Sequence, residues 1–107
     1  LMNDVQHVEA ARAFAERVLG QPGTDQERLD RAFRTVTAST PVAAERRLLQ
    51  ESLQTHRARF TQAPEEAKRV LTNGESKPRE DLPPVEVAAW TLVANLLFNL
   101  DETLSRN

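Results

Sequence analysis

The sequence predicts an all-α fold, a compact bundle of about five helices with the C-terminal helix at its centre. Apolar residues recur at helical spacing in each long segment, and no segment alternates apolar with polar residues as a half-buried strand does. Capping and helix-breaking residues separate these segments. The last segment, residues 84–104, is apolar around most of its circumference, which is typical of a helix that other elements surround.

Length and composition narrow the class of protein. The 107 residues suit one core, so residues 1–107 are expected to form a single helical domain. The sequence has no Cys, which excludes disulfides, thiolate metal sites and a haem-attachment motif within these residues. The formal net charge is −2, from 16 acidic and 14 basic residues. Nucleic-acid modules normally carry a basic balance, so no nucleic-acid partner is expected.

Targeting and membrane patterns are also missing from the sequence. Nothing at the start resembles a signal peptide or a transit segment. The longest apolar run, around residues 87–100, is interrupted by Thr91, Asn95 and Asn99 and is too short to span a bilayer, so we expect no membrane span. Because a helix is predicted to begin almost at Leu1, we expect these residues to be a fragment of a larger protein.

Capping boxes predict the first two helices. The first helix is expected to begin at Asn3, whose reciprocal partner is Gln6, and to end at Gly20. The second is expected to begin at Thr24, paired with Glu27, and to run to about residue 38. The apolar stripes are Val5, Val8, Ala11 or Arg12, Ala15 and Leu19 in the first helix, and Leu29, Ala32, Phe33 and Val36 in the second.

A Thr-Pro pair predicts the start of the third helix. Thr40 is expected to cap it, and Pro41 suits the first helical position, where its missing N–H costs nothing. The helix is expected to run to about Gln62 and to be the longest apart from the last. Its predicted inner stripe is Val42, Glu45 or Arg46, Leu49, Leu53, His56 and Phe60, widened by Leu48.

A short fourth helix and a loop precede the last helix. Pro64 restarts the chain as a helix that runs to about Thr72, with Ala67, Val70 and Leu71 facing inward. Residues 75–83 contain one aliphatic side chain and two Pro, so we predict a surface loop there. The Pro83-Pro84 pair then leads into the central helix.

The central helix leaves one narrow polar stripe, which is the most specific feature of the sequence. Thr91, Asn95, Asn99 and Glu102 follow one another at helical spacing. One hypothesis is an interaction stripe that presents hydrogen-bonding groups to a partner domain. The alternatives are a face that touches water, or an Asn pair that binds the backbone of a neighbouring loop such as residues 75–83. A buried amide without a partner costs about 1–3 kcal/mol, so a covered stripe must find partners.

No residue pattern predicts catalysis, a cofactor or a metal in these residues. Neither His7 nor His56 has further ligands at metal-binding spacing beyond Asp4, so we expect a surface group at His7 and a half-buried ring at His56. Asp101 and Glu102 lie at the helix end that disfavours acids, where Arg106 or an arginine of the first helix could neutralise them. The arginines of the second and third helices alternate with acids, which favours a solvated, ion-paired face over an anion site.

Three stretches carry a family resemblance. They are LMNDVQHVEAARAFAERVL, RLDRAFRTVTASTPVAAERRLL and VAAWTLVANLLFNLDETLSR, and together they extend almost from Leu1 to Asn107. The chain resembles the C-terminal part of the planctomycete-type family called domain of unknown function 1553. The closing stretch is the most specific of the three. One departure is Thr40 before Pro41, where the family pattern has residues such as Arg-Pro or Pro-Thr.

The resemblance implies a setting rather than a reaction. Proteins of that family are long and exported, and they often carry a cytochrome-c-like domain upstream. This chain would then be an extracytoplasmic, helical C-terminal module whose partners are upstream domains of the same polypeptide. The first hypothesis is a structural or interaction module that packs against such a domain, through the polar stripe or the exposed side of the first helix. The alternative is one wall of an enzyme active site in the parent protein, for polysaccharide breakdown or haem-linked oxidation.

We predict that Trp90→Ala leaves the domain largely unfolded, because Trp90 is the only Trp and lies on the central helix. Truncating a buried Trp costs about 3–5 kcal/mol, against a total stability of about 5–15 kcal/mol for a domain of this size. Thermal unfolding followed by circular dichroism checks this. A cooperative transition with a midpoint near that of the unchanged protein would contradict the central position of Trp90.

Overall fold

The fold is all-α, as the sequence predicts. A computed structural model describes the backbone of residues 5–72 and 77–105, and the side chains of residues 9–72 and 77–101. Those residues contain helices and connecting turns, without a strand. The helices are α1 (Val5–Leu19), α2 (Asp25–Thr37), α3 (Ala43–Gln62), α4 (Pro64–Leu71) and α5 (Pro84–Ser105). The predicted capping box at Asn3 and Gln6 lies outside the described side chains.

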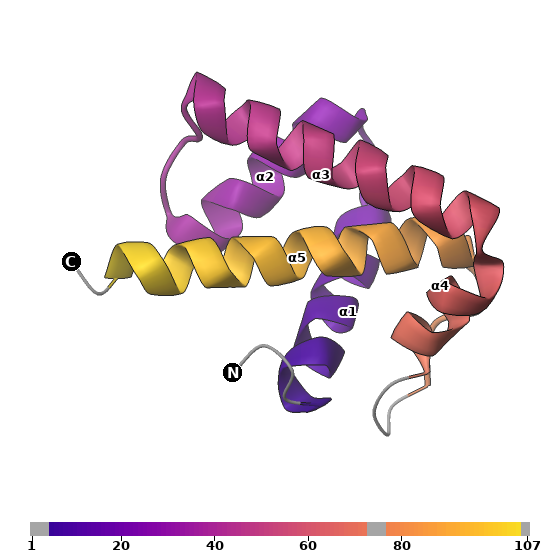
Figure 1. The fold of residues 1–107 in the computed structure, drawn as a ribbon. Coiled ribbons are helices and arrows are strands. Elements are labelled where there is room, and N and C mark those ends of the chain that lie inside the picture. Colours follow the sequence, from indigo (N-terminus) through magenta and orange to yellow (C-terminus); the bar gives the residue numbers. More distant parts are fainter. Residues whose placement is uncertain (1–4, 73–76, 106–107) are drawn as a thin grey trace.

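The last helix is the centre of the bundle. Figure 1 shows α5 running through the middle, with α3 along one side of it and α1 crossing it on another. Helix α5 contacts each of the other four. The Trp90 side chain is only 2% exposed, and Val87, Ala88 and Ala89 are buried beside it. The predicted central position of α5 is therefore confirmed.

Local capping chemistry sets most helix ends. The Thr24 hydroxyl accepts a hydrogen bond from the Glu27 N–H at 3.2 Å, and the Glu27 carboxylate accepts one from the Thr24 N–H at 2.8 Å, so this predicted capping box is confirmed. The Gly20 N–H donates to the carbonyl of Glu16 at the end of α1. Helix α4 begins at Pro64, as predicted.

The predicted start of the third helix is wrong by two residues. Val42, not Thr40, is the N-cap of α3, and the helix begins at Ala43. The Glu45 carboxylate accepts a hydrogen bond from the Val42 N–H at 2.9 Å, which satisfies the backbone donor at the cap. The Pro41 side chain is buried, so packing, rather than a first helical position, accounts for its place.

Two predicted inner residues of α3 are exposed instead. Leu49, Leu53 and Phe60 are buried, whereas Val42 is 60% exposed and Leu48 is 43% exposed. Val42 precedes the helix, so it does not share the helical periodicity. Leu48 lies about 100° around the helix from Leu49, beyond the arc that the rest of the bundle covers.

One arginine links three helices. The Arg57 guanidinium of α3 donates to the Asp25 carboxylate at the start of α2, at 2.9 and 3.2 Å. It also donates to the Glu86 carboxylate at the start of α5, with both distances 2.8 Å. These hydrogen bonds raise the pKa of Arg57, so its charge is permanent. The Arg57 side chain is 25% exposed, so water screens these pairs only in part.

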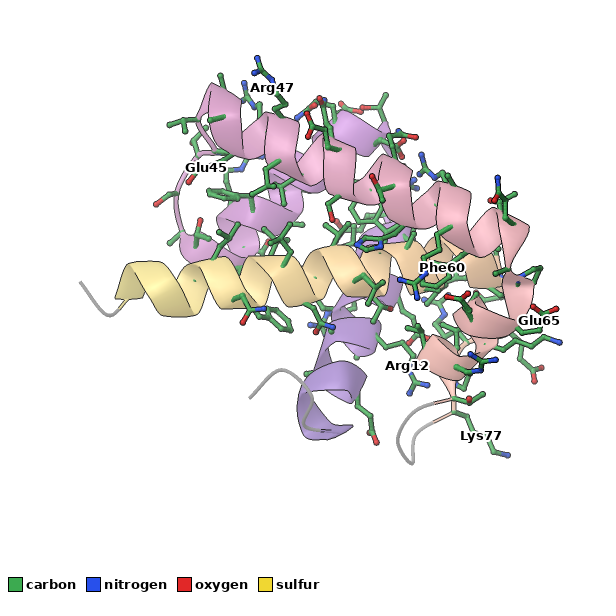
Figure 2. All side chains as sticks on the ribbon, viewed as in Figure 1. Arg12, Glu45, Arg47, Phe60, Glu65 and Lys77 are labelled. Atoms are coloured by element: carbon green, nitrogen blue, oxygen red, sulfur yellow. The ribbon has the colours of Figure 1, made fainter. Side chains whose placement is uncertain are left out.

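A second arginine ties the first helix to the fourth. The buried Arg12 side chain reaches from α1 toward α4 (Figure 2), and its Nη1 donates to the carbonyl of Leu71 at 2.5 Å. The loop before α5 is also attached to α1, because the Arg79 N–H donates to the Glu16 carboxylate at 2.8 Å. These contacts tie α1 to the end of α4 and to the loop that precedes α5.

We expect Arg57→Ala to lower the free energy of unfolding by about 1–3 kcal/mol, because it removes the charged hydrogen bonds from α3 to Asp25 of α2 and to Glu86 of α5. Urea unfolding at 0.1 M salt measures the change. Arg47→Ala is the matched control: Arg47 is exposed at the outer end of α3 (Figure 2), so this change should stay within about 0.5 kcal/mol. Equal effects of the two variants would contradict the role of Arg57.

Candidate functional site

The polar stripe of α5 passes from the core to the surface. Thr91 is fully buried, and its hydroxyl donates to the carbonyl of Val87 at 2.6 Å. Asn95 is half-buried and Asn99 is exposed. The Glu102 side chain lies outside the described residues. The alternative that the whole stripe touches water is therefore wrong at Thr91. The hydroxyl of this buried residue has its hydrogen-bond partner within α5.

The carboxamide of Asn95 is the unusual member of the stripe. Its Oδ1 is buried and accepts no hydrogen bond from the part of the chain that the structure describes. A buried acceptor without a donor costs about 1–3 kcal/mol. One alternative was a contact between the Asn pair and the loop at residues 75–83. Within residues 77–83 that loop gives Asn95 Oδ1 no donor, and its Arg79 N–H donates to Glu16 instead. Asn95 is therefore the member of the stripe whose buried acceptor has no donor within the described part of the domain.

A surface hollow lies beside the stripe, between α3, α4 and α5. It has a volume of about 260 Å³ and its lining is mainly apolar. Phe60 is at the junction of the three helices (Figure 2). Arg59 forms an ion pair with Glu66 at 2.6 Å and lies 5.6 Å from the centre of the Phe60 ring. The lining residues are Arg59, Phe60, Glu66, Arg69, Val70 and Leu92.

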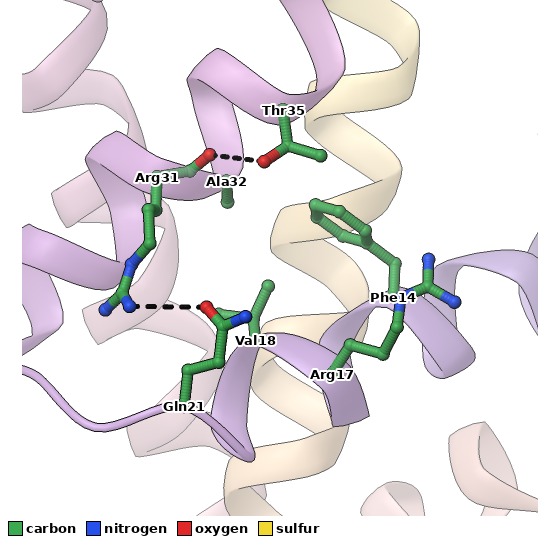
Figure 3. A pocket seen from close by; sticks show the side chains of 7 residues that line it. All are labelled: Phe14, Arg17, Val18, Gln21, Arg31, Ala32 and Thr35. Atoms are coloured by element: carbon green, nitrogen blue, oxygen red, sulfur yellow. Dashed lines mark hydrogen bonds between the residues drawn. The ribbon is translucent and has the colours of Figure 1, made fainter.

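A second hollow lies between α1 and α2 (Figure 3) and was not predicted from the sequence. Its volume is about 120 Å³, and its lining residues are Phe14, Arg17, Val18, Gln21, Arg31, Ala32 and Thr35. Arg31 lies on one side and Arg17 on the other, with Phe14 and Val18 between them in Figure 3. The sequence gives no indication of this site, because the two helices that form it show ordinary amphipathic patterns and their pairing is a tertiary property.

The histidine and acidic side chains of the described residues offer no metal-binding cluster. In the part of the chain that the structure describes, no three His, Asp or Glu side chains come together as metal ligands. His56 is half-buried, as predicted, and stacks on Phe60 with 6.4 Å between ring centres. Burial, and then the charge of Arg59, lower the pKa of His56. Among the described side chains, Asp101 has no ion pair with an arginine of α1.

Comparisons with known proteins give no relative. No family model matches the sequence, no curated protein matches it, and no solved structure matches it. Among the described residues, no helix is both long enough and apolar enough to cross a membrane. The resemblance to the planctomycete-type family and the extracytoplasmic location that it implies stay predictions.

We predict that His56 makes the domain less stable in acid. The folded state holds the pKa of His56 below its usual 6.5, so the unfolded chain binds the proton more readily. Stability is therefore complete above pH 6.5 and falls as the pH drops toward the lower folded pKa, by at most about 1.4 kcal/mol per pH unit. Urea unfolding between pH 7 and pH 5 should show a shallower fall in His56→Gln. The matched variant is His7→Gln; loss of the slope in that variant alone would contradict the assignment.

Proposed function

We propose that these residues form a helical interaction module of a larger exported, extracytoplasmic bacterial protein, and that the module packs against an upstream domain of the same polypeptide. The surface that would do so is the docking face of α5, which we define as Leu92, Asn95, Leu96 and Asn99. The observation that carries the proposal is the half-buried state of Leu92, Asn95 and Leu96, which share one side of α5 and keep surface that a partner could cover.

The spacing of the docking face suits a helix packed against a protein surface. Its four residues stand at i, i+3, i+4 and i+7, so they lie on one side of α5. Leu92 and Leu96 are half-buried, which leaves apolar surface that a partner could cover. The remaining two side chains are uncharged amides, so a partner could cover this face without the cost of burying a charge.

The size of the docking face supports a partner on the same chain. Among the described residues the large apolar side chains that are exposed are Val42 and Leu48, both outside α5, so α5 offers only partly covered leucines. Such a small contact is weak between separate molecules. A tether raises the effective concentration of the partner to about the millimolar range, where a weak contact is sufficient.

No observation favours the alternative of an enzyme wall. That hypothesis needed Asp4, His7, Asn95, Asn99 and Asp101 to converge on one concave site. Asp101 follows Asn99 by two residues, so it points about 160° away around α5. The side chains of Asp4 and His7 lie outside the described residues.

The test is site-specific photo-crosslinking in the natural polypeptide. Benzoylphenylalanine in place of Leu96 should crosslink to peptides from outside residues 1–107, as identified by mass spectrometry. The same group in place of Leu48, which is exposed on α3, is the matched control and should give few such products. No crosslink at position 96, or equal yields at both positions, would overturn the proposal.

A second measurement uses Asn95 itself. In the isolated domain, Asn95→Leu should raise the free energy of unfolding by about 1–2 kcal/mol, since it removes an unsatisfied acceptor and a poor helix former. In the natural polypeptide, the same change should reduce the crosslinks at position 96. Thr91→Val is the comparison, because the satisfied Thr91 hydroxyl offers no such gain. Destabilisation of the isolated domain by Asn95→Leu would show that Asn95 already has its partner.

A further inference from the structure

We propose that the α1–α2 hollow is a docking site for an acidic segment of a partner protein. An apolar side chain of that segment would enter the hollow, and carboxylates on either side of it would meet Arg31 and Arg17. The site uses neither α5 nor any residue of the docking face, so this inference goes beyond the proposed function and does not rest on it.

The volume of the hollow suits a single amino-acid side chain better than a free metabolite. The volume of the hollow is about 120 Å³. Sites that enclose a drug-sized ligand usually have about 300–1,000 Å³. The floor between the two arginines consists of Phe14, Val18 and Ala32, which are apolar. Phe14 and Ala32 are already buried, so Val18 supplies most of the apolar surface that one aliphatic side chain would cover.

The Arg31 guanidinium is held in position by the turn between α1 and α2. Its Nη2 donates to the carbonyl of Pro22 at 2.7 Å, and its Nη1 donates to the Gln21 side-chain oxygen at 3.2 Å. Gly23 has a φ of 139°, and a Cβ at this position would lie 2.7 Å from Arg31 Nη2, so a glycine is needed for the close approach. The cation is therefore ordered before any partner arrives, which reduces the entropy cost of binding.

The charges around the hollow are not neutralised by its own lining. No carboxylate lines it. Arg17 forms no ion pair with a described carboxylate; its guanidinium lies 5.8 Å from the centre of the Phe14 ring. Hydrogen bonds from Thr24 and, less strongly, the nearby charge of Arg31 lower the pKa of Glu27, which lies outside the lining, so Glu27 compensates the charge of Arg31 in part.

The polar groups of the lining favour a partner that accepts hydrogen bonds. The two guanidinium groups can only donate, and the Gln21 side-chain oxygen is already occupied by Arg31. The Thr35 hydroxyl donates to the carbonyl of Arg31 at 2.8 Å. Because Arg17 and Arg31 stand on opposite sides of the apolar floor (Figure 3), one carboxylate would not meet both. The complementary sequence is an apolar residue between two acidic ones.

The test titrates a short peptide into ¹⁵N-labelled protein. The probe is an acetylated and amidated seven-residue peptide with Glu-Leu-Glu at its centre and Ala elsewhere. We expect saturable shifts of the backbone amides of Val18, Gln21, Ala32 and Thr35, and weaker binding when sodium chloride is raised from 0.1 to 0.5 M. Replacing the two Glu by Gln, or the Leu by Ser, should each weaken binding by about threefold or more.

Protein variants complete the test. Arg17→Gln should weaken binding of the Glu-Leu-Glu peptide by about threefold to fivefold, as expected for one exposed ion pair. Arg34→Gln, which changes an exposed arginine of α2 outside the hollow, should leave it unchanged. Arg31→Gln removes the charge but also breaks the hydrogen bonds of Arg31 to the turn between α1 and α2. Arg31→Lys, which keeps the charge, is therefore its control. Equal binding of the Gln-Leu-Gln peptide, shifts located elsewhere, or the same shifts with inorganic phosphate alone would overturn the proposal. Benzoylphenylalanine at position 96 does not affect this readout, so the two proposals can fail separately.

Discussion

Enclosure of the first half of α5 is the constraint on which the fold depends. Val87, Ala88, Ala89 and Trp90 are consecutive and all buried. Four consecutive residues make a complete helical turn, so neighbours must be present on every side of α5 at this level. The two alanines let neighbouring helices approach closely, and Trp90 fills the larger gap on the other side. In this fold the four other helices, which all contact α5, provide those neighbours.

Neighbouring helices enclose the second half of α5 less completely. Leu92, Asn95 and Leu96 are half-buried, and Asn99 is exposed. Phe98 remains attached to the bundle through Phe14 of α1, with 5.8 Å between the ring centres. Phe14 also lines the α1–α2 hollow, so one ring both holds the second half of α5 and forms part of that hollow.

Local chemistry was predictable from the sequence, and tertiary contacts were not. The capping box at Thr24 and Glu27 and the start of α4 at Pro64 depend on residues three or fewer positions apart, and both were predicted. The error at Thr40 and Pro41 arose because Pro41 is buried ahead of the helix, and Glu45 accepts the hydrogen bond of the actual N-cap, Val42. Leu48 was placed inside on periodicity alone, which does not define how wide an arc the neighbours cover.

The candidate sites show the same division. Helical spacing put Thr91, Asn95 and Asn99 on one stripe, but it could not show that Thr91 is buried while Asn99 is exposed, because burial depends on where the other helices end. The buried Oδ1 of Asn95 and the α1–α2 hollow follow from distances between elements that are far apart in the sequence. No pattern within one helix contains that information.

The position of the central helix at the end of this helical series has a consequence for synthesis. Helices α1–α4 emerge from the ribosome before α5, the element that contacts all of them. Until α5 follows, the apolar sides of the nascent helices lack the element that covers them in the complete fold. The nascent chain therefore passes through an exposed, aggregation-prone stage in which chaperones would bind it, and the bundle forms in one late step.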